Sequence, residues 1–285
     1  MNNMGTIPPD AVTIYNNALE MSNKGDFYNA ITEYKKAIDQ YPNFIEAYNN
    51  MGEIYSQMGK KDLAIAIYQD ALKINRSSRV LLNIGVEHYN SKNFDAALNY
   101  FSESLTAQPN FLEGNFYSAL VFYNKNDFQT AERYFKNVLK LDKKHLKTNY
   151  LLSYIYYEWK EYHKAIKCLD NIKDIADDIS FVNRYYGFCW YYLGNYEKAV
   201  SYLKTALESR PEYLKFKGYL ESLTIESKIN EIGDIDAAIR DLESKMMNEA
   251  PPLKEVTKLS MLYIFKGENS KAEKLLLEAK QKLAS

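Results

Sequence analysis

The chain has 285 residues, with 36 Lys and Arg against 37 Asp and Glu, so its formal net charge is −1. This balance gives no electrostatic preference for nucleic acid or an anionic membrane, and no apolar run has the roughly 20 residues of a membrane span. The two cysteines make no disulfide framework and no secretory signal is visible, which together predict a protein of the reducing cytoplasm.

Eight alanines recur along the chain at a nearly constant spacing. The successive steps are 34, 33, 34, 34, 34, 39 and 34 residues. A period of this size is typical of a helical-repeat array, in which each repeat packs on its neighbours. The recurring residues are Ala30, Ala64, Ala97, Ala131, Ala165, Ala199, Ala238 and Ala272.

The residues before each alanine predict a helix, a turn and a second helix. A glycine often stands five places before it and suits the left-handed backbone that ends the first helix, helix A. An Asp or Asn follows, where its side chain can cap the second helix, helix B. The alanine then lets the two helices approach closely. The glycines are Gly25, Gly59, Gly194, Gly233 and Gly267, and the caps are Asp26, Asn93, Asp127, Asn195 and Asp234.

Counted back from the alanines, eight units follow a short polar lead at residues 1–10. They begin near Ala11, Ile45, Ser78, Leu112, Leu146, Ser180, Tyr219 and Leu253. We group them as repeats one to six over 11–213 and repeats seven and eight over 214–285, which end in a capping helix. The 39-residue step falls between Pro211 and Gly233, where we expect one long helix over Leu214–Glu231. That helix either continues an unbroken array or bends the last two repeats to a new angle.

Several units match the pattern W-x₂-L-G-x₂-Y, followed by A-x₃-F and then Pro. The second unit has Tyr48, Met51, Gly52 and Tyr55 before Ala64 and Tyr68. In these residues the chain resembles the tetratricopeptide repeat family, over nearly its whole length. The resemblance implies an all-α fold, a right-handed α-solenoid superhelix of about eight helix–turn–helix repeats, and a function in binding other proteins.

No arrangement of reactive side chains predicts catalysis. His88, His145 and His163 fall in different repeats or on different faces, and no Cys or His pair has zinc-site spacing. The stretch Gly59-Lys60-Lys61 lacks the earlier glycine of a phosphate-binding loop. We therefore expect no enzyme activity, no metal and no cofactor.

The resemblance also implies that positions 2, 5, 6, 9, 12 and 13 of each helix A line a concave groove. Asn16, Asn50 and Asn83 all stand at position 6. An amide can donate and accept at once, which suits a peptide backbone, and the row is similar to the asparagine ladder of the O-linked N-acetylglucosamine transferases. The Lys and Asn set that clamps acidic chaperone tails is not expected here, because Tyr15 and Leu19 stand at its first two positions.

The same register places a group of aromatic residues in repeats four to six. We expect a partner-binding surface there, with Tyr117, Tyr154 and Tyr185 as a staggered row in one concavity. The alternative is that these side chains are half-buried packing residues with wet hydroxyl groups. The candidate binding residues are Phe116, Tyr117, Tyr123, Tyr150, Tyr154, Tyr157, Phe181, Arg184, Tyr185 and Phe188.

These patterns predict a non-catalytic scaffold or adaptor that holds an extended or helical segment of a partner protein in its groove. One alternative is a structural subunit of a larger assembly, such as a bacterial motility or secretion machine, that packs through its convex face or ends. A regulatory module that acts on a separate enzyme is a third. We expect neither nucleic-acid binding nor membrane insertion, and a monomer or weak homo-oligomer.

Overall fold

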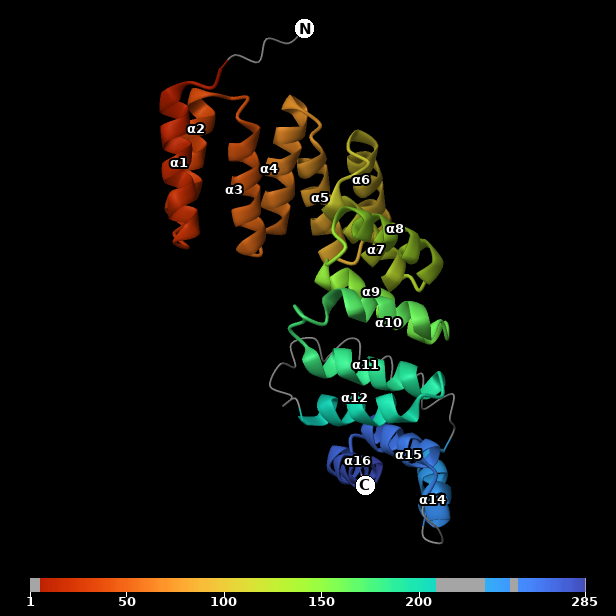
Figure 1. The fold of residues 1–285 in the computed structure, drawn as a ribbon. Coiled ribbons are helices and arrows are strands. Elements are labelled where there is room, and N and C mark those ends of the chain that lie inside the picture. The colour runs from red at the N-terminus through yellow and green to blue at the C-terminus, as the bar shows by residue number, and fades with distance from the viewer. Residues whose placement is uncertain (1–5, 209–233, 247–250, 285) are drawn as a thin grey trace. The chain divides into compact units, whose positions relative to one another are not determined.

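The computed structural model describes residues 6–208, 234–246 and 251–284, which form fifteen α-helices and no strand (Figure 1). The expected all-α solenoid is confirmed. The helices fall into an N-terminal unit, residues 1–142, and a C-terminal unit, residues 143–285. The expected helix at Leu214–Glu231, together with Pro211 and Gly233, lies outside the described residues.

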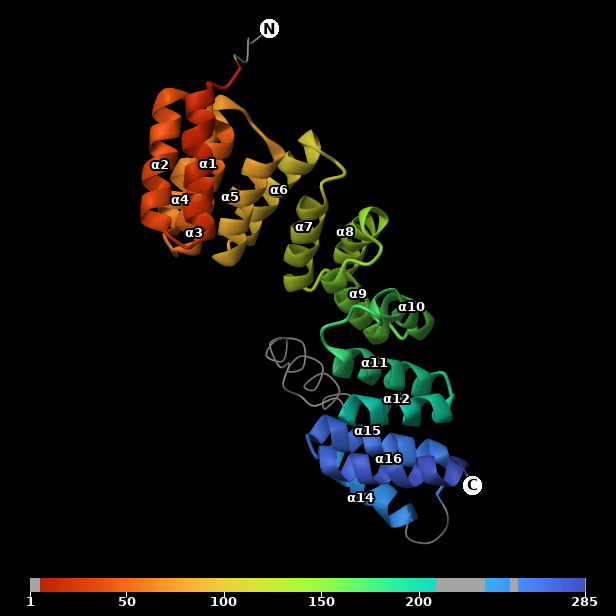
Figure 2. The same cartoon turned by 60° about the vertical axis from the view of Figure 1, so that its left-hand side comes forward.

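The N-terminal unit consists of four helix pairs, each an A helix followed by a B helix. The B helices α2, α4 and α6 each also contact the A helix of the next pair, so the four pairs stack in sequence order (Figure 2). Helix α1 begins at Pro9, two residues before the predicted start, because proline lacks an N–H that the first turn leaves unpaired anyway. The helices are α1 (Pro9–Asn23), α2 (Phe27–Gln40), α3 (Ile45–Gln57), α4 (Lys61–Ile74), α5 (Ser78–Asn90), α6 (Phe94–Ala107), α7 (Leu112–Asn124) and α8 (Phe128–Leu141).

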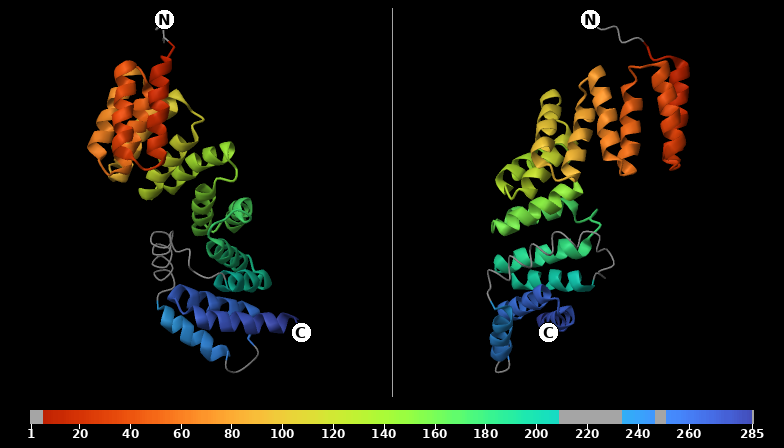
Figure 3. Two further views of the ribbon diagram at one scale, coloured as in Figure 1. Left: turned by 90° about the vertical axis from the view of Figure 1, so that its left-hand side faces the viewer. Right: turned by 180° about the vertical axis from the view of Figure 1, so that it is seen from behind.

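The C-terminal unit contains three described pairs and one further helix. They are α9 (Leu146–Glu158) with α10 (Tyr162–Ile172), α11 (Ile179–Tyr192) with α12 (Tyr196–Glu208), α15 (Leu253–Lys266) with α16 (Asn269–Ala284), and the separate α14 (Ile235–Met246). Helices α15 and α16 both contact α12, and α15 also contacts α11 and α14 (Figure 3). In strictly sequential stacking the seventh repeat would separate these pairs. The last pair therefore packs on the sixth repeat, out of sequence order.

The turn between helices A and B has one backbone conformation in seven pairs. Gly25, Gly59, Gly194 and Gly267 have φ between 72° and 81°. In the other three pairs Lys92, Asn126 and Lys160 take the same left-handed region at φ of 59° to 61°. A residue with a Cβ is strained there. The fold therefore imposes this turn even where the sequence does not favour it.

Hydrogen bonds confirm four of the five predicted caps of helix B. The side chains of these four residues accept from the backbone N–H three residues later, over 2.9 to 3.4 Å; the residues are Asn93, Asp127, Asn195 and Asp234. The fifth residue, Asp26, does stand at the N-cap position of α2, but its side chain makes no such bond and instead accepts from the Asn29 side chain at 2.7 Å.

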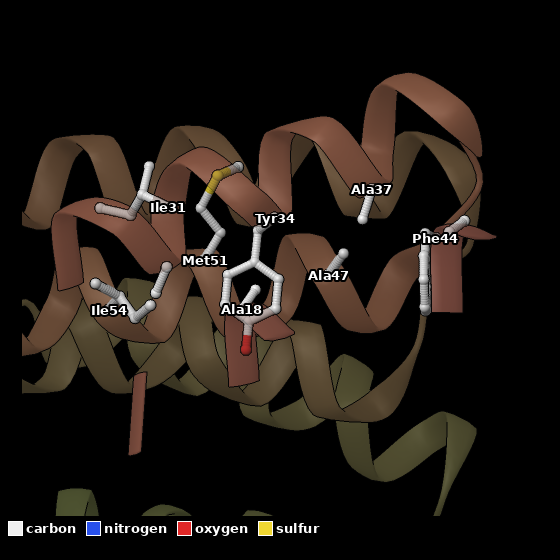
Figure 4. Packing of buried hydrophobic residues seen from close by; sticks show 10 residues of the cluster. Ala18, Ile31, Tyr34, Ala37, Phe44, Ala47, Met51 and Ile54 are labelled. Carbon is white, nitrogen blue, oxygen red and sulfur yellow. The ribbon is translucent and has the colours of Figure 1, made fainter. Parts of the chain in front are cut away.

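Close contact between helices A and B makes the core of each pair. Seven of the eight recurring alanines are fully buried, and Ala238 is half-buried. The position four residues later holds a buried large side chain, such as Tyr34, which shares a cluster with Ala18 and Met51 (Figure 4). A Cβ added to Gly52 would lie 2.3 Å from the Tyr68 ring. Small residues are therefore required where the helices meet.

Candidate protein-interaction site

The A helices of each unit form a layer that presents the predicted interaction positions. In the N-terminal unit α1 contacts α3, α3 contacts α5, and α5 contacts α7. In the C-terminal unit α9 contacts α11. Side chains that project between neighbouring A helices can therefore interact along the layer, and they do so very differently in the two units.

Amide groups cross the A-helix layer of the N-terminal unit. The Asn50 amide donates to the Tyr15 hydroxyl at 2.9 Å and to the Tyr34 hydroxyl at 3.3 Å. One repeat later, the Asn83 amide donates to the Asn49 Oδ1 at 2.8 Å. Asn50 and Asn83 are half-buried, whereas Asn16 is exposed. Two members of the predicted ladder are thus oriented by neighbouring repeats, a positioning network that the sequence alone did not reveal.

Carboxylates lie among these amides. Asn49 donates to the Glu53 Oε1 at 2.9 Å, and Asn83 donates to the same atom at 3.3 Å. The Ser56 hydroxyl donates to Glu87, whose residue is only 6% exposed. Burial and the charges of Glu46 and Glu53 raise the pKa of Tyr15, against the opposing effect of its bond from Asn50. The layer therefore combines hydrogen-bonding amides with negative charge.

The last A helix of this unit is more apolar. Phe116 and Tyr123 are buried. Tyr117 is half-buried, and its ring centroid lies 5.7 to 5.9 Å from those of Phe116, Tyr89 and Phe101. Burial raises the pKa of Tyr117, with a further contribution from Glu113. Of the three aromatic candidates on α7, Tyr117 alone keeps substantial exposed surface.

Most aromatic candidates of the C-terminal unit are packing residues of the isolated chain. Five of the six aromatic candidates are at most 6% exposed: Tyr150, Tyr154, Tyr157, Tyr185 and Phe188. The Tyr157 ring lies 5.3 Å from that of Tyr185 and 5.9 Å from that of Phe188, and Phe188 lies 5.1 Å from Phe265 of α15. Burial raises the pKa of Tyr157 well above its ordinary value.

Tyr150 has a specific structural contact. Its hydroxyl donates to the Asp177 carboxylate at 3.0 Å and accepts from the Asp178 N–H at 3.1 Å, which ties α9 to the start of α11. Phe181 and Arg184 remain half-buried. Tyr154 and Tyr185 pack against each other with ring centroids 6.5 Å apart. Their burial favours the packing alternative over a row of accessible anchors.

Among the described residues, no group of three or more His, Cys, Asp or Glu side chains is arranged to hold a metal ion. No described helix is long and apolar enough to cross a membrane. Cys168 and Cys189 are both buried, and burial raises the pKa of Cys189 to about 12.

Helix pairs that repeat every 34 residues or so, with left-handed turns and small residues at the A–B contact, define an α-helical repeat protein. Family models narrow this class. Tetratricopeptide repeat models match residues 23–59, 45–78 and 191–213, and a model described as anaphase-promoting complex, cyclosome, subunit 3 matches residues 90–172. The chain belongs to the tetratricopeptide repeat family.

Solved structures share the fold. A structure titled as the functional characterization of Pseudomonas aeruginosa pilF has a TM-score of 0.61 at 21% identity, covering 73% of this chain and 96% of that one. The structure of PilW, titled a type IV pilus biogenesis factor, has a TM-score of 0.58 at 18% identity, and the match covers 73% of this chain and 96% of that one. A tetratricopeptide repeat protein from Parabacteroides merdae has a TM-score of 0.56 at 17% identity, and the match covers 95% of this chain and 100% of that one. No curated protein matches the sequence.

Proposed function

We propose that the chain is a non-catalytic scaffold that holds a segment of a partner protein on the A-helix layer of its N-terminal unit. Tetratricopeptide repeat proteins bind protein partners, which gives the general role. The specific location is supported by the amide row, because Asn16 is exposed and the side chains of Asn50 and Asn83 are held in place by Tyr15 and Asn49. Because the N–H groups of Asn50 and Asn83 already donate within the layer, their side-chain oxygens can accept from main-chain N–H groups of an extended segment at little entropic cost.

The burial of the aromatic residues supports the same location. An anchor residue contributes to binding when the partner removes its surface from water. Tyr154, Tyr157 and Tyr185 have little surface left to remove in the free chain. Half-buried Tyr117, Phe181 and Arg184 remain candidates for secondary contacts. A cytoplasmic location belongs to this proposal and is supported by the low cysteine content, two residues in 285.

The test is a comparative capture experiment with the whole chain. Tagged wild type, an Asn16→Ala/Asn50→Ala/Asn83→Ala triple variant and the control Asn99→Ala are each used to capture proteins from an extract of the native organism. Asn99 is an exposed asparagine on the B helix α6, so its loss removes an amide from the other layer. A captured protein is then measured by calorimetry as a synthetic segment. Each lost hydrogen bond should weaken binding by ~0.5–1.5 kcal/mol.

Circular dichroism of the triple variant must show wild-type helicity, because Asn50 also bonds to two tyrosines. A partner lost by the triple variant and retained by Asn99→Ala supports the proposal. Equal capture by all three proteins contradicts it. Self-association in sedimentation, with no captured partner, would instead favour the structural-subunit alternative.

A further inference from the structure

Charge is segregated between the two helix layers of the N-terminal unit. The A helices α1, α3, α5 and α7 contain six carboxylates and a single Lys or Arg, which is Arg79. The B helices α2, α4, α6 and α8 contain seven acidic and seven basic residues. Arg79 pairs with Glu113 at 3.3 Å, and Lys24, which follows α1, pairs with Glu20 at 2.6 Å. Neither cation pairs with Glu46, Glu53 or Glu87.

Three of these carboxylates lie near the amide row. Glu46 and Glu53 on α3 are exposed, and Glu87 on α5 is buried. These carboxylates act in pairs on the same tyrosine hydroxyls. Glu46 and Glu53 both raise the pKa of Tyr15, and Glu53 and Glu87 both raise the pKa of Tyr68, in each case after the larger effect of burial. The three carboxylates therefore lie together on α3 and the neighbouring α5, within electrostatic range of Tyr15 on α1 and Tyr68 on α4.

Glu87 gives an independent indication of a missing partner. The residue is 6% exposed, and its carboxylate accepts from the Ser56 hydroxyl, but no Lys or Arg in the described part of the chain forms an ion pair with it. The neighbouring His88 does not supply the charge, because burial and Lys61 lower its pKa. Buried carboxylates are normally paired with a cation, since the interior solvates them poorly. Ser56 lies at an interaction position of α3, so a cation docked there would reach Glu87.

We propose that the segment held by the N-terminal unit is extended and cationic, with Lys or Arg side chains that meet Glu46, Glu53 and Glu87. This inference rests on the proposed function and adds the chemistry of the partner. An extended segment presents alternate side chains to the layer, so its main chain can meet the amides while its basic side chains meet the carboxylates. Acidic segments are repelled by the same potential, which gives selectivity.

The test uses three fluorescent ten-residue peptides that alternate serine with lysine, glutamine or glutamate. Their binding to the full chain is measured by anisotropy at 50 mM and 200 mM salt. The lysine peptide should bind best, and its affinity should fall with added salt because screening weakens exposed ion pairs. The Glu53→Gln/Glu87→Gln variant should bind it about 5- to 20-fold more weakly. Glutamine at 87 can still accept the hydrogen bond from Ser56, so the fold is preserved.

A matched control removes the same charge from the other layer. Asp39→Asn/Asp70→Asn changes one residue on α2 and one on α4, both B helices, and should leave the affinity within about twofold. Equal losses in both double variants, equal binding of all three peptides, or binding of none overturns the inference. If the glutamine peptide binds as well as the lysine peptide and the triple asparagine variant abolishes both, the proposed function stands and the charge preference falls. If only the glutamate substitutions weaken binding of the lysine peptide, the preference for a cationic segment is supported and the contact with the asparagine amides is contradicted.

Discussion

The two units differ in how accessible their side chains are at equivalent positions of the repeat. At position 6 the first three repeats of the N-terminal unit have amides that are exposed or half-buried, and its fourth has the half-buried Tyr117. The C-terminal unit has Leu151 and Tyr185 there, both buried. The difference arises from what packs beside the A helices. In the C-terminal unit α15 contacts α11, and the ring of Phe265 meets that of Phe188. A register position thus predicts where a side chain projects, while the neighbouring helices decide whether it stays accessible.

The largest expected loss of stability follows from truncating one of the packed aromatic residues of the C-terminal unit. Tyr157→Ala should destabilise the C-terminal unit by ~3–5 kcal/mol, because a large buried side chain leaves a cavity. Urea unfolding followed by circular dichroism measures the loss. The control Tyr28→Ala removes a tyrosine that is 70% exposed and should change stability by less than ~0.5 kcal/mol. A stable Tyr157→Ala protein that loses its partner would instead make Tyr157 an accessible anchor.

The next largest loss of stability is expected from a change at an A–B helix contact of the N-terminal unit. Ala131→Leu adds methylene groups at a fully buried position of α8 and should cost ~1–3 kcal/mol through overpacking. Hydrogen exchange should show the damage mainly in α7, α8 and the neighbouring α6, since repeats act on their neighbours. The matched Ala107→Leu change lies at an exposed site on α6 and should have little effect. Unchanged exchange around α8 would show that the register is wrong.

The buried thiol of the C-terminal unit predicts a pH dependence. Burial raises the pKa of Cys189 to about 12, above its ordinary value of 9.0. The unfolded chain therefore releases this proton first, so the thiol's contribution to stability is complete below pH 9 and is lost as the pH rises toward 12. Between pH 7.5 and 10, wild type should lose ~1 kcal/mol more than Cys189→Ala in urea unfolding. Parallel pH profiles would mean that the thiol is accessible in the folded chain.

The smallest effect concerns the strained turns. Lys160→Gly should stabilise the C-terminal unit by ~0.5–1 kcal/mol, because glycine relieves the left-handed strain at φ 61° but costs chain entropy. The reciprocal Gly194→Lys should destabilise by a similar amount at φ 78°. Thermal unfolding of both variants provides the comparison. If both changes shift stability in the same direction, turn strain is not the cause.

The sequence predicted the repeat because each of its signals acts within one or two helices. The alanine at each A–B contact, the αL turn and the cap of helix B are local requirements, and the structure meets them at almost every copy. The exception, Asp26, has an alternative donor in Asn29 one turn away. Local chemistry of this kind is readable without knowledge of the tertiary arrangement.

The candidate site was less predictable because it depends on contacts between repeats. The spacing placed Asn50 and Asn83 correctly on A helices but did not show their bonds to Tyr15 and Asn49. It also gave no reason to select Glu87, whose role follows from burial beside Ser56 one repeat earlier. For the tyrosines of α9 and α11, composition alone left binding and packing open, and the out-of-order contact of α15 with α11 favours packing.

Hydroxyl-radical footprinting of individual tyrosines, with and without a bound partner segment, tests the contrast between the units most directly. In the free chain, half-buried Tyr15 should be modified several times faster than Tyr154, Tyr157 and Tyr185. Binding should protect Tyr15 and leave the three buried tyrosines unchanged. Rapid modification of Tyr154 and Tyr185 in the free chain, followed by their protection on binding, would contradict the account and return the binding surface to the C-terminal unit.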